Sequence, residues 1–108
     1  LAMVMFTFDL AEELAGTGVT VNSVHPASLM NTKMVFGTDY FGPPMTTVEE
    51  GAHAVEYVAT SSEIDGVTGK YFEGTRRASA HPQAYDPDAR WRLKTLSERL
   101  VKAKEAIV

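Results

Sequence analysis

The apolar character of the first fifteen residues most constrains what this chain can fold into. Leu1 to Phe8 contain a single polar residue, Thr7, and no glycine or proline interrupts positions 1–15, which predicts a helix. A helix whose first two turns are apolar almost all round must be covered on more than one side. Asp9 ends the run well short of the roughly 20 residues that a membrane span needs, and no basic region marks a secretory signal. We therefore expect a buried helix, in a chain that is truncated upstream.

Helix and strand signals alternate along the chain. The segment 18–25 is rich in β-branched residues and is closed by Pro26, which predicts a strand. Glycines, prolines and no clear period mark 27–46 as a loop, and its apolar content favours a lid over a substrate. The predicted elements are helix 1–15, strand 18–25, lid 27–46, helix 47–61, strand 67–73 and helix 86–104.

Two helices carry start signals and apolar stripes. Thr47 with Glu50 three residues later fits a capping box, and Asp86 followed by Pro87 fits an N-cap and first helical position. The predicted core stripes are Val48, Ala52, Val55 and Ala59 in the second helix, and Ala89, Leu93, Leu96, Leu100 and Ala103 in the third.

This order predicts one α/β domain over residues 1–108, forming half of an alternating fold with a parallel sheet. Two parallel strands do not make a stable sheet, because both faces and both edges need covering. The domain is therefore expected to be incomplete as it stands.

Composition excludes several classes of function. The chain has no cysteine and a formal net charge of −4, which gives no thiolate site and no footprint for nucleic acid or an anionic membrane. Residues 1–65 hold nine acids and one base, whereas residues 66–108 hold nine bases and five acids. We interpret the basic end as a solvated helix plus the pair Arg76-Arg77. His25, His53 and His81 lack metal-ligand spacing, so no metal site is expected.

The strongest local signal for binding follows the first strand. Ligands of open α/β sheets bind beyond the carboxyl ends of the strands. The segment from His25 to Thr32 lies there, and the hydroxyls of Ser28 and Thr32 could hold a planar amide or a phosphate oxygen. An ordinary turn at a strand end is the alternative. Gly16-Thr17-Gly18 connects a helix to a strand, the wrong order for a dinucleotide cradle, and predicts a turn.

The stretch from Val19 to Ala27 resembles the V-x-V-N-x-x-x-P-G segment of the classical short-chain dehydrogenases/reductases. In that family the segment follows the helix that begins near a catalytic Y-x-x-x-K, and residues 1–15 resemble the rest of that helix. The capped helix at Thr47, the strand from Val67 to Phe72 and the last helix match as well. The resemblance covers essentially the whole chain.

The resemblance implies the C-terminal portion of a Rossmann-type doubly wound parallel sheet. It further implies a cytoplasmic NAD(P)-dependent oxidoreductase that interconverts a carbonyl and an alcohol on an apolar small molecule, and a homo-oligomer formed through helix 1–15. The implied cofactor-binding residues are Pro26, Ala27, Ser28, Leu29 and Thr32. The implied substrate lid contains Met34, Val35, Phe36, Tyr40 and Phe41.

The sequence departs from the family at several points. Ala27 stands where glycine is usual, and Thr32 aligns with the family's threonine only through a one-residue insertion, so Asn31 competes for that role. No tyrosine is followed four residues later by lysine, so no catalytic residue is expected within these 108 residues. The choice between NAD and NADP stays open, because the family makes it after a strand absent here. The alternative function is a non-catalytic α/β module that pairs with a partner protein.

Overall fold

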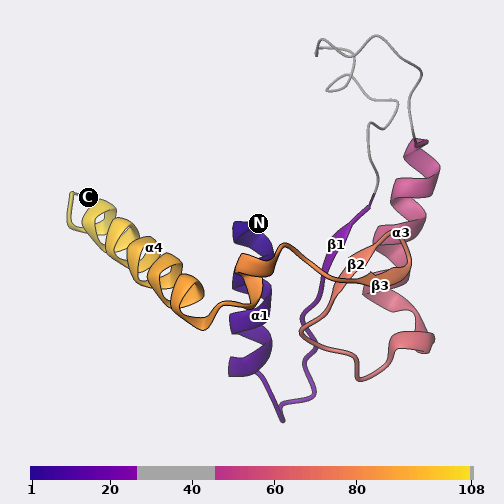
Figure 1. Ribbon diagram of the computed structural model, residues 1–108, viewed down its shortest axis with the longest axis horizontal. Helices are drawn as coiled ribbons and strands as arrows, with labels where there is room; N and C mark the ends of the chain where they lie inside the picture. The colour runs from indigo at the N-terminus through magenta and orange to yellow at the C-terminus, as the bar shows by residue number, and fades with distance from the viewer. Residues whose placement is uncertain (27–45, 108) are drawn as a thin grey trace, which may run out of the picture.

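The computed structural model describes residues 1–26 and 46–107 (Figure 1). The elements in chain order are α1 (Ala2–Glu13), β1 (Ser23–His25), α3 (Val48–Thr60), η1 (Ser62–Ile64), β2 (Tyr71–Glu73), β3 (Arg76–Ala78), η2 (Pro82–Tyr85) and α4 (Pro87–Ile107). Figure 1 shows the sheet flanked by α1 and α3, and both helices contact β1. The arrangement is the expected α/β architecture, with helices on both sides of a sheet.

The sheet is mixed. β1 and β2 pair in parallel, with Ser23 opposite Tyr71, whereas β2 and β3 are antiparallel, with Glu73 opposite Arg76. The sequence predicted the parallel pair and no helix or strand between residues 73 and 86, and β3 and η2 correct that prediction. The reason is local: Gly74, at φ +63°, supplies the conformation that a two-residue hairpin loop requires.

Both parallel strands are shorter than predicted. The structure has β1 at Ser23–His25 in place of 18–25, and β2 at Tyr71–Glu73 in place of 67–73. The segments that lead into the two strands are still joined by hydrogen bonds, several of them through side chains.

The core lies between α1, η2 and the start of α4. Met5 and Phe8 of α1 are buried against Ala80 and Ala84, and the rings of Phe8 and Tyr85 stack at a centroid distance of 5.2 Å. Val4, Tyr71, Ala89 and Leu93 complete this cluster. The sheet and the C-terminal elements both pack against α1 and bury part of the apolar surface of its first turns. Met3 and Leu10 nevertheless stay exposed.

The predicted apolar stripe of α3 is exposed and not buried in the core. The helix buries Gly51 and Ala54, one helical turn apart, and β1 packs against α3. Val48, Ala52, Val55 and Ala59 are exposed instead. Small residues at 51 and 54 let the helix approach the strand closely, which the periodicity of larger apolar residues did not indicate.

α4 departs from its prediction in its second half. Ala89 and Leu93 pack on the core, but Leu96 and Leu100 of the same stripe are exposed, Leu100 by 61%. Figure 1 shows α4 leaving the body of the molecule, so the stripe runs past the surface that would cover it. Over the described residues, no helix is both long enough and apolar enough to cross a membrane.

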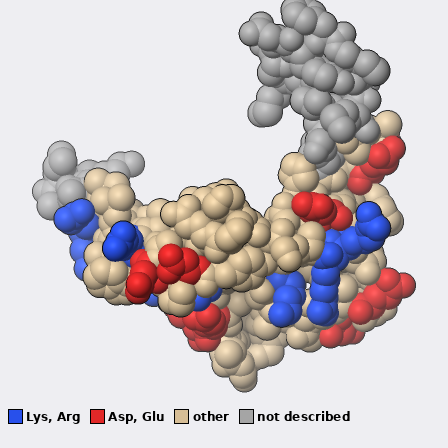
Figure 2. Space-filling view, viewed as in Figure 1, with Lys and Arg blue, Asp and Glu red and all other residues tan. Residues whose placement is uncertain are grey.

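We expected the basic side chains of α4 to be solvated, but two of them form ion pairs with α1. Arg90 lies 3.5 Å from Asp9 and 3.3 Å from Glu12, and Lys94 lies 2.6 Å from Glu13. Figure 2 shows acidic and basic side chains side by side where the two helices meet. The acidic face of α1 and the basic start of α4 are therefore complementary.

Candidate functional site

The carboxyl end of β1 carries a row of ionisable side chains. The strand register sets His25 of β1 opposite Glu73 of β2, and Glu73 opposite Arg76 of β3. Directly opposed residues of neighbouring strands project from the same face of a sheet. All three side chains are exposed, and the His25 carbonyl accepts a hydrogen bond of 2.9 Å from the Gly74 amide. This edge therefore presents donors and acceptors together at the place where α/β sheets bind ligands.

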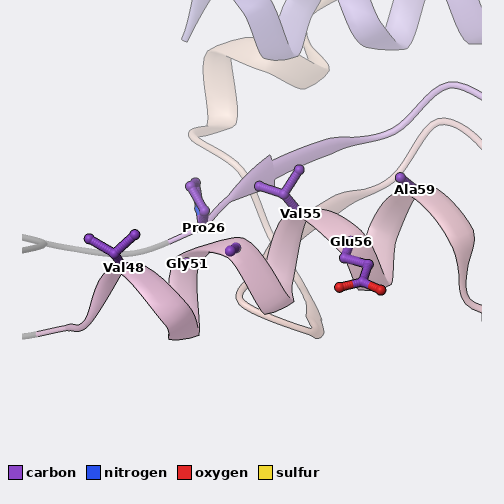
Figure 3. Close-up of a pocket in the computed structure, with 7 residues that line it drawn as sticks. Pro26, Val48, Gly51, Val55, Glu56 and Ala59 are labelled. Atoms are coloured by element: carbon purple, nitrogen blue, oxygen red, sulfur yellow. The ribbon is translucent and has the colours of Figure 1, made fainter.

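An apolar groove of about 480 Å³ opens beside the same strand end (Figure 3). The half-buried Pro26 lines it on one side and one face of α3 on the other. In Figure 3, Val48 and Val55 point to the side on which Pro26 lies, while the carboxylate of Glu56 points away. The described residues that line it are Pro26, Val48, Gly51, Ala52, Val55, Glu56 and Ala59. The stripe that sequence analysis assigned to the core is therefore the wall of this groove.

The described lining of the groove is mostly apolar. Among the residues that the structure describes, Glu56 is the one ionisable residue in the lining, and the rest are aliphatic or glycine. Such a surface takes up apolar groups by excluding water, whether they belong to a small molecule or to another protein segment. Within residues 1–26 and 46–107, no three histidine, cysteine or acidic residues gather closely enough to hold a metal ion.

Two tyrosines have raised pKa values for different reasons. The Tyr57 hydroxyl donates a 3.0 Å hydrogen bond to the Glu63 carboxylate, and this bond raises the pKa of Tyr57. Burial raises the pKa of Tyr71, and the carboxylate of Glu73 adds to the shift. Both shifts favour the neutral phenol, so neither tyrosine is suited to act as a base near neutral pH.

Most of the predicted site residues lie outside the described part of the chain. Pro26 is placed, at the end of β1 and on the wall of the groove. The remaining cofactor candidates and the predicted lid belong to residues 27–45, outside the described residues: Ala27, Ser28, Leu29, Thr32, Met34, Val35, Phe36, Tyr40 and Phe41.

The histidines stay apart from one another. His25 is on β1 and His53 is on α3, while His81 caps η2 by accepting the Gln83 amide at 3.1 Å through Nδ1.

Sequence analysis missed two polar residues that join the approaches to the strands. The Asn22 side chain bonds to the backbone of residues 67 and 70, and the Thr68 hydroxyl accepts the Val21 amide. An amide side chain inside a β-branched run was the available signal, because a strand residue of that kind needs polar partners when it is half-buried.

The chain was compared with known proteins. It is 35% identical to mouse retinol dehydrogenase 13 over 94% of its length, and 32% identical to human retinol dehydrogenase 12 over 94%. It is 31% identical to zebrafish WW domain-containing oxidoreductase over 96%. The chain spans about a third of the length of these relatives, 34%, 34% and 27% respectively. No protein-family model and no solved structure matches it.

The matched regions are the C-terminal parts of the relatives, which agrees with the order of elements observed here. The chain corresponds to the C-terminal part of members of the short-chain dehydrogenase/reductase family. The family also fits the α/β layering of the structure.

Proposed function

We propose that this chain supplies the nicotinamide-side loop and the substrate lid of an NAD(P)-dependent oxidoreductase that interconverts a carbonyl and an alcohol on an apolar small molecule. The names of the relatives support oxidoreductase chemistry. The single observation that carries the proposal is the end of β1. There the V-x-V-N-x-x-x-P stretch ends at the carboxyl edge of the parallel pair β1–β2. The apolar groove and the row of His25, Glu73 and Arg76 lie at the same edge.

The described residues at this edge fit a nicotinamide. Its flat ring is compatible with the apolar side of Pro26, and its carboxamide with donors and acceptors such as the row of His25, Glu73 and Arg76. When bound, the nicotinamide supplies or receives the hydride. The proposed contacts of this chain are Pro26, Ala27, Ser28, the Leu29 backbone and Thr32, and their task is to bind and orient the cofactor.

The proposed lid shapes an apolar substrate pocket. Met34, Val35, Phe36, Tyr40 and Phe41 give it a mostly apolar surface. A lid of this composition excludes water and favours an apolar substrate over a charged one. The choice between NAD and NADP is left to the assay below.

The proposal extends to assembly and location. The exposed Met3 and Leu10, seven positions apart, leave an apolar face on α1 that a second copy of the protein could cover. We place the protein in the cytoplasm as part of the same proposal, tested by cell fractionation. Size-exclusion chromatography of the full-length gene product with Met3→Glu and Leu10→Glu tests assembly, because both changes put a charge on that face without touching the groove.

The test of function is a reductase assay on the full-length gene product. We expect consumption of NADH or NADPH with an apolar aldehyde or ketone. Thr32→Ala should raise the KM for the cofactor, Thr32→Ser should restore it, and Asn31→Ala should leave it unchanged. If Asn31→Ala and not Thr32→Ala raises that KM, the threonine assignment is wrong. A protein that turns over no carbonyl or alcohol with either cofactor contradicts the proposal.

The second candidate function is a non-catalytic module that pairs with a partner protein. The observation in its favour is the amount of unpartnered apolar surface, in the groove on α3 and on the outer turns of α4. It predicts a stable, cooperatively melting 108-residue species of defined mass without added partners.

A further inference from the structure

The two segments that lead into β1 and β2 differ in length by one residue. The Val21 carbonyl accepts the Gly69 amide at 2.8 Å, which sets Val21 opposite Thr68 in a parallel pair. Two residues later, Ser23 is opposite Tyr71. Between these two pairs, the first segment has one residue, Asn22, whereas the second has two, Gly69 and Lys70. The segment 67–71 therefore contains a bulge of one residue.

Side chains satisfy the backbone groups that the bulge frees. The Val21 amide, which a regular ladder would join to the Val67 carbonyl, donates to the Thr68 hydroxyl at 2.9 Å. The Val67 carbonyl accepts the Asn22 side-chain amide at 2.9 Å instead. The Asn22 side-chain oxygen accepts the amide of the extra residue, Lys70, at 3.1 Å. We call these three hydrogen bonds the Asn22–Thr68 plug.

The bulge has an identifiable cause. Gly69 adopts φ +69°, a left-handed conformation that carries the chain out of the regular ladder. A Cβ at this position would lie 3.4 Å from the Ala11 Cβ, so the bulged segment also lies directly against α1. Bulges are frequent next to active sites, where they redirect the strand that follows.

We propose that the Asn22–Thr68 plug is a positioning device for the ligand-binding edge. It fixes the offset between the two strands, and with it the point at which His25 and Pro26 leave the sheet. β1 is only three residues long, so its own ladder specifies register weakly. A slip of one residue would move that edge by about 3.3 Å and turn every side chain to the other face.

This inference rests on the proposed function for its ligand and extends it to residues far from the ligand. The plug lies at the amino end of β1, and the proposed cofactor contacts follow its carboxyl end in the sequence. Asn22 and Thr68 are therefore positioning residues and not catalytic ones.

The test uses the full-length gene product with Thr68→Val, which removes the hydroxyl at nearly constant shape, and Asn22→Ala. Thr68→Ser is the conservative rescue. Thr60→Val is the matched control, since that hydroxyl serves only α3 by donating to the Glu56 carbonyl. Amide hydrogen exchange is read at Val21 and Lys70 within the plug, and at Gly74, whose amide bonds to His25 at the far end of β1.

We expect Thr68→Val and Asn22→Ala to speed exchange at Gly74 by up to about tenfold, the range of a lost net hydrogen bond. NADH or NADPH affinity, measured where each variant is fully folded, should fall about tenfold, because small displacements of a bound reactant are costly. Thr68→Ser and Thr60→Val should behave as the wild type.

Faster exchange at Val21 and Lys70 with unchanged protection at Gly74 would overturn the inference. The plug would then stabilise only its own hydrogen bonds and not the carboxyl end of β1. Cofactor affinity within twofold of wild type in both variants would overturn it as well. A wild-type protein that binds neither cofactor would overturn the proposed function, while exchange at Gly74 would still decide whether the plug sets the strand end.

Discussion

Thr47 shows how one side chain determines where a helix starts. Its hydroxyl accepts the Glu50 amide at 3.1 Å, the bond of an N-cap. We expect Thr47→Ala to lower the free energy of unfolding by about 1 kcal/mol, measured by urea denaturation of the full-length gene product. Thr47→Ser keeps the acceptor and should leave the free energy of unfolding unchanged, because serine is at least as good an N-cap as threonine. Equal losses in the two variants would mean that the cap contributes nothing.

Gly69 and Gly66 allow a comparison of how much stability is lost when a left-handed glycine is replaced in contact with α1 or in open space. Their φ values are +69° and +76°, and a Cβ would meet Ala11 at 3.4 Å in the first case and open space in the second. Because 3.4 Å is van der Waals distance, Gly69→Ala and Gly66→Ala should each cost about 1–2 kcal/mol from the backbone alone. Thermal unfolding measures both. A much larger loss for Gly69→Ala would show that α1 and the bulge tolerate no added atom.

Single residues were predicted from the sequence where their partners are close in the chain. Thr47 bonds three residues ahead, and Asp86 accepts the amides of Asp88 and Ala89 at 3.0 and 3.4 Å. Asn22 was missed because its partners lie more than forty positions away, across a bulge that no local pattern encodes. Capping is local chemistry, whereas strand offset is set by the whole sheet.

At the scale of elements, the contact between α1 and α4 depends on charge. The Arg90 side chain is 13% exposed and faces Asp9 and Glu12, while Lys94 and Glu13 are largely solvated. Arg90→Met should cost about 1.5–3 kcal/mol, as lost bonds to charged groups do, and Lys94→Met less than about 1 kcal/mol. Urea denaturation at low and high salt checks both, and salt should reduce only the Lys94 effect strongly. The reverse order of the two losses would contradict the observed burial.

The end of α3 offers a pH-dependent contact. The bond from Tyr57 to Glu63 joins α3 to η1 and raises the pKa of Tyr57 above its ordinary value of 10.0. A group whose pKa is raised by folding stabilises the fold below its unfolded pKa and loses that contribution as pH rises through the folded value. Tyr57→Phe should therefore be less stable than wild type at pH 7–9, and the difference should disappear above the raised pKa. A difference that persists unchanged at strongly alkaline pH would contradict this account.

Element order was predictable and packing faces were not. Helices α1, α3 and α4 lie where composition, apolar stripes and caps predicted them, because propensity and caps are properties of the local sequence. The period did not tell which side of α3 would meet β1, since both Gly51-Ala54 and the stripe through Val55 are apolar. The antiparallel β3 followed from the Gly74 turn, a single residue within a segment of otherwise irregular composition.

At the scale of the whole molecule, the described elements leave apolar surface exposed. The groove on α3, the outer turns of α4 and the exposed Met3 and Leu10 are examples. Such patches mark surfaces that bind other segments or ligands. We expect the isolated 108-residue chain to bind a hydrophobic dye and to melt without a sharp transition, and the full-length gene product to melt cooperatively. A sharp, concentration-independent melt of the isolated chain would favour the partner-binding module.

The sequence predicted the family because several moderate motifs occur in the right order over the whole chain. It could not locate the groove, because the groove is made by Pro26 and α3, which residues 27–47 separate in the sequence. The cofactor and lid residues 27–45 stay predictions that depend on binding data.

Titration of NADH and NADPH into the full-length gene product tests the central claim most directly. The wild type and Leu29→Ala should bind one of the two cofactors, because both keep the backbone amide at position 29. Leu29→Pro, which removes that amide, should bind about tenfold more weakly or not at all, since an unpaired carboxamide loses a hydrogen bond. Equal affinity of all three proteins would contradict the assignment of this loop to the nicotinamide. No binding by the wild type would contradict the account of the chain as part of an NAD(P)-dependent oxidoreductase.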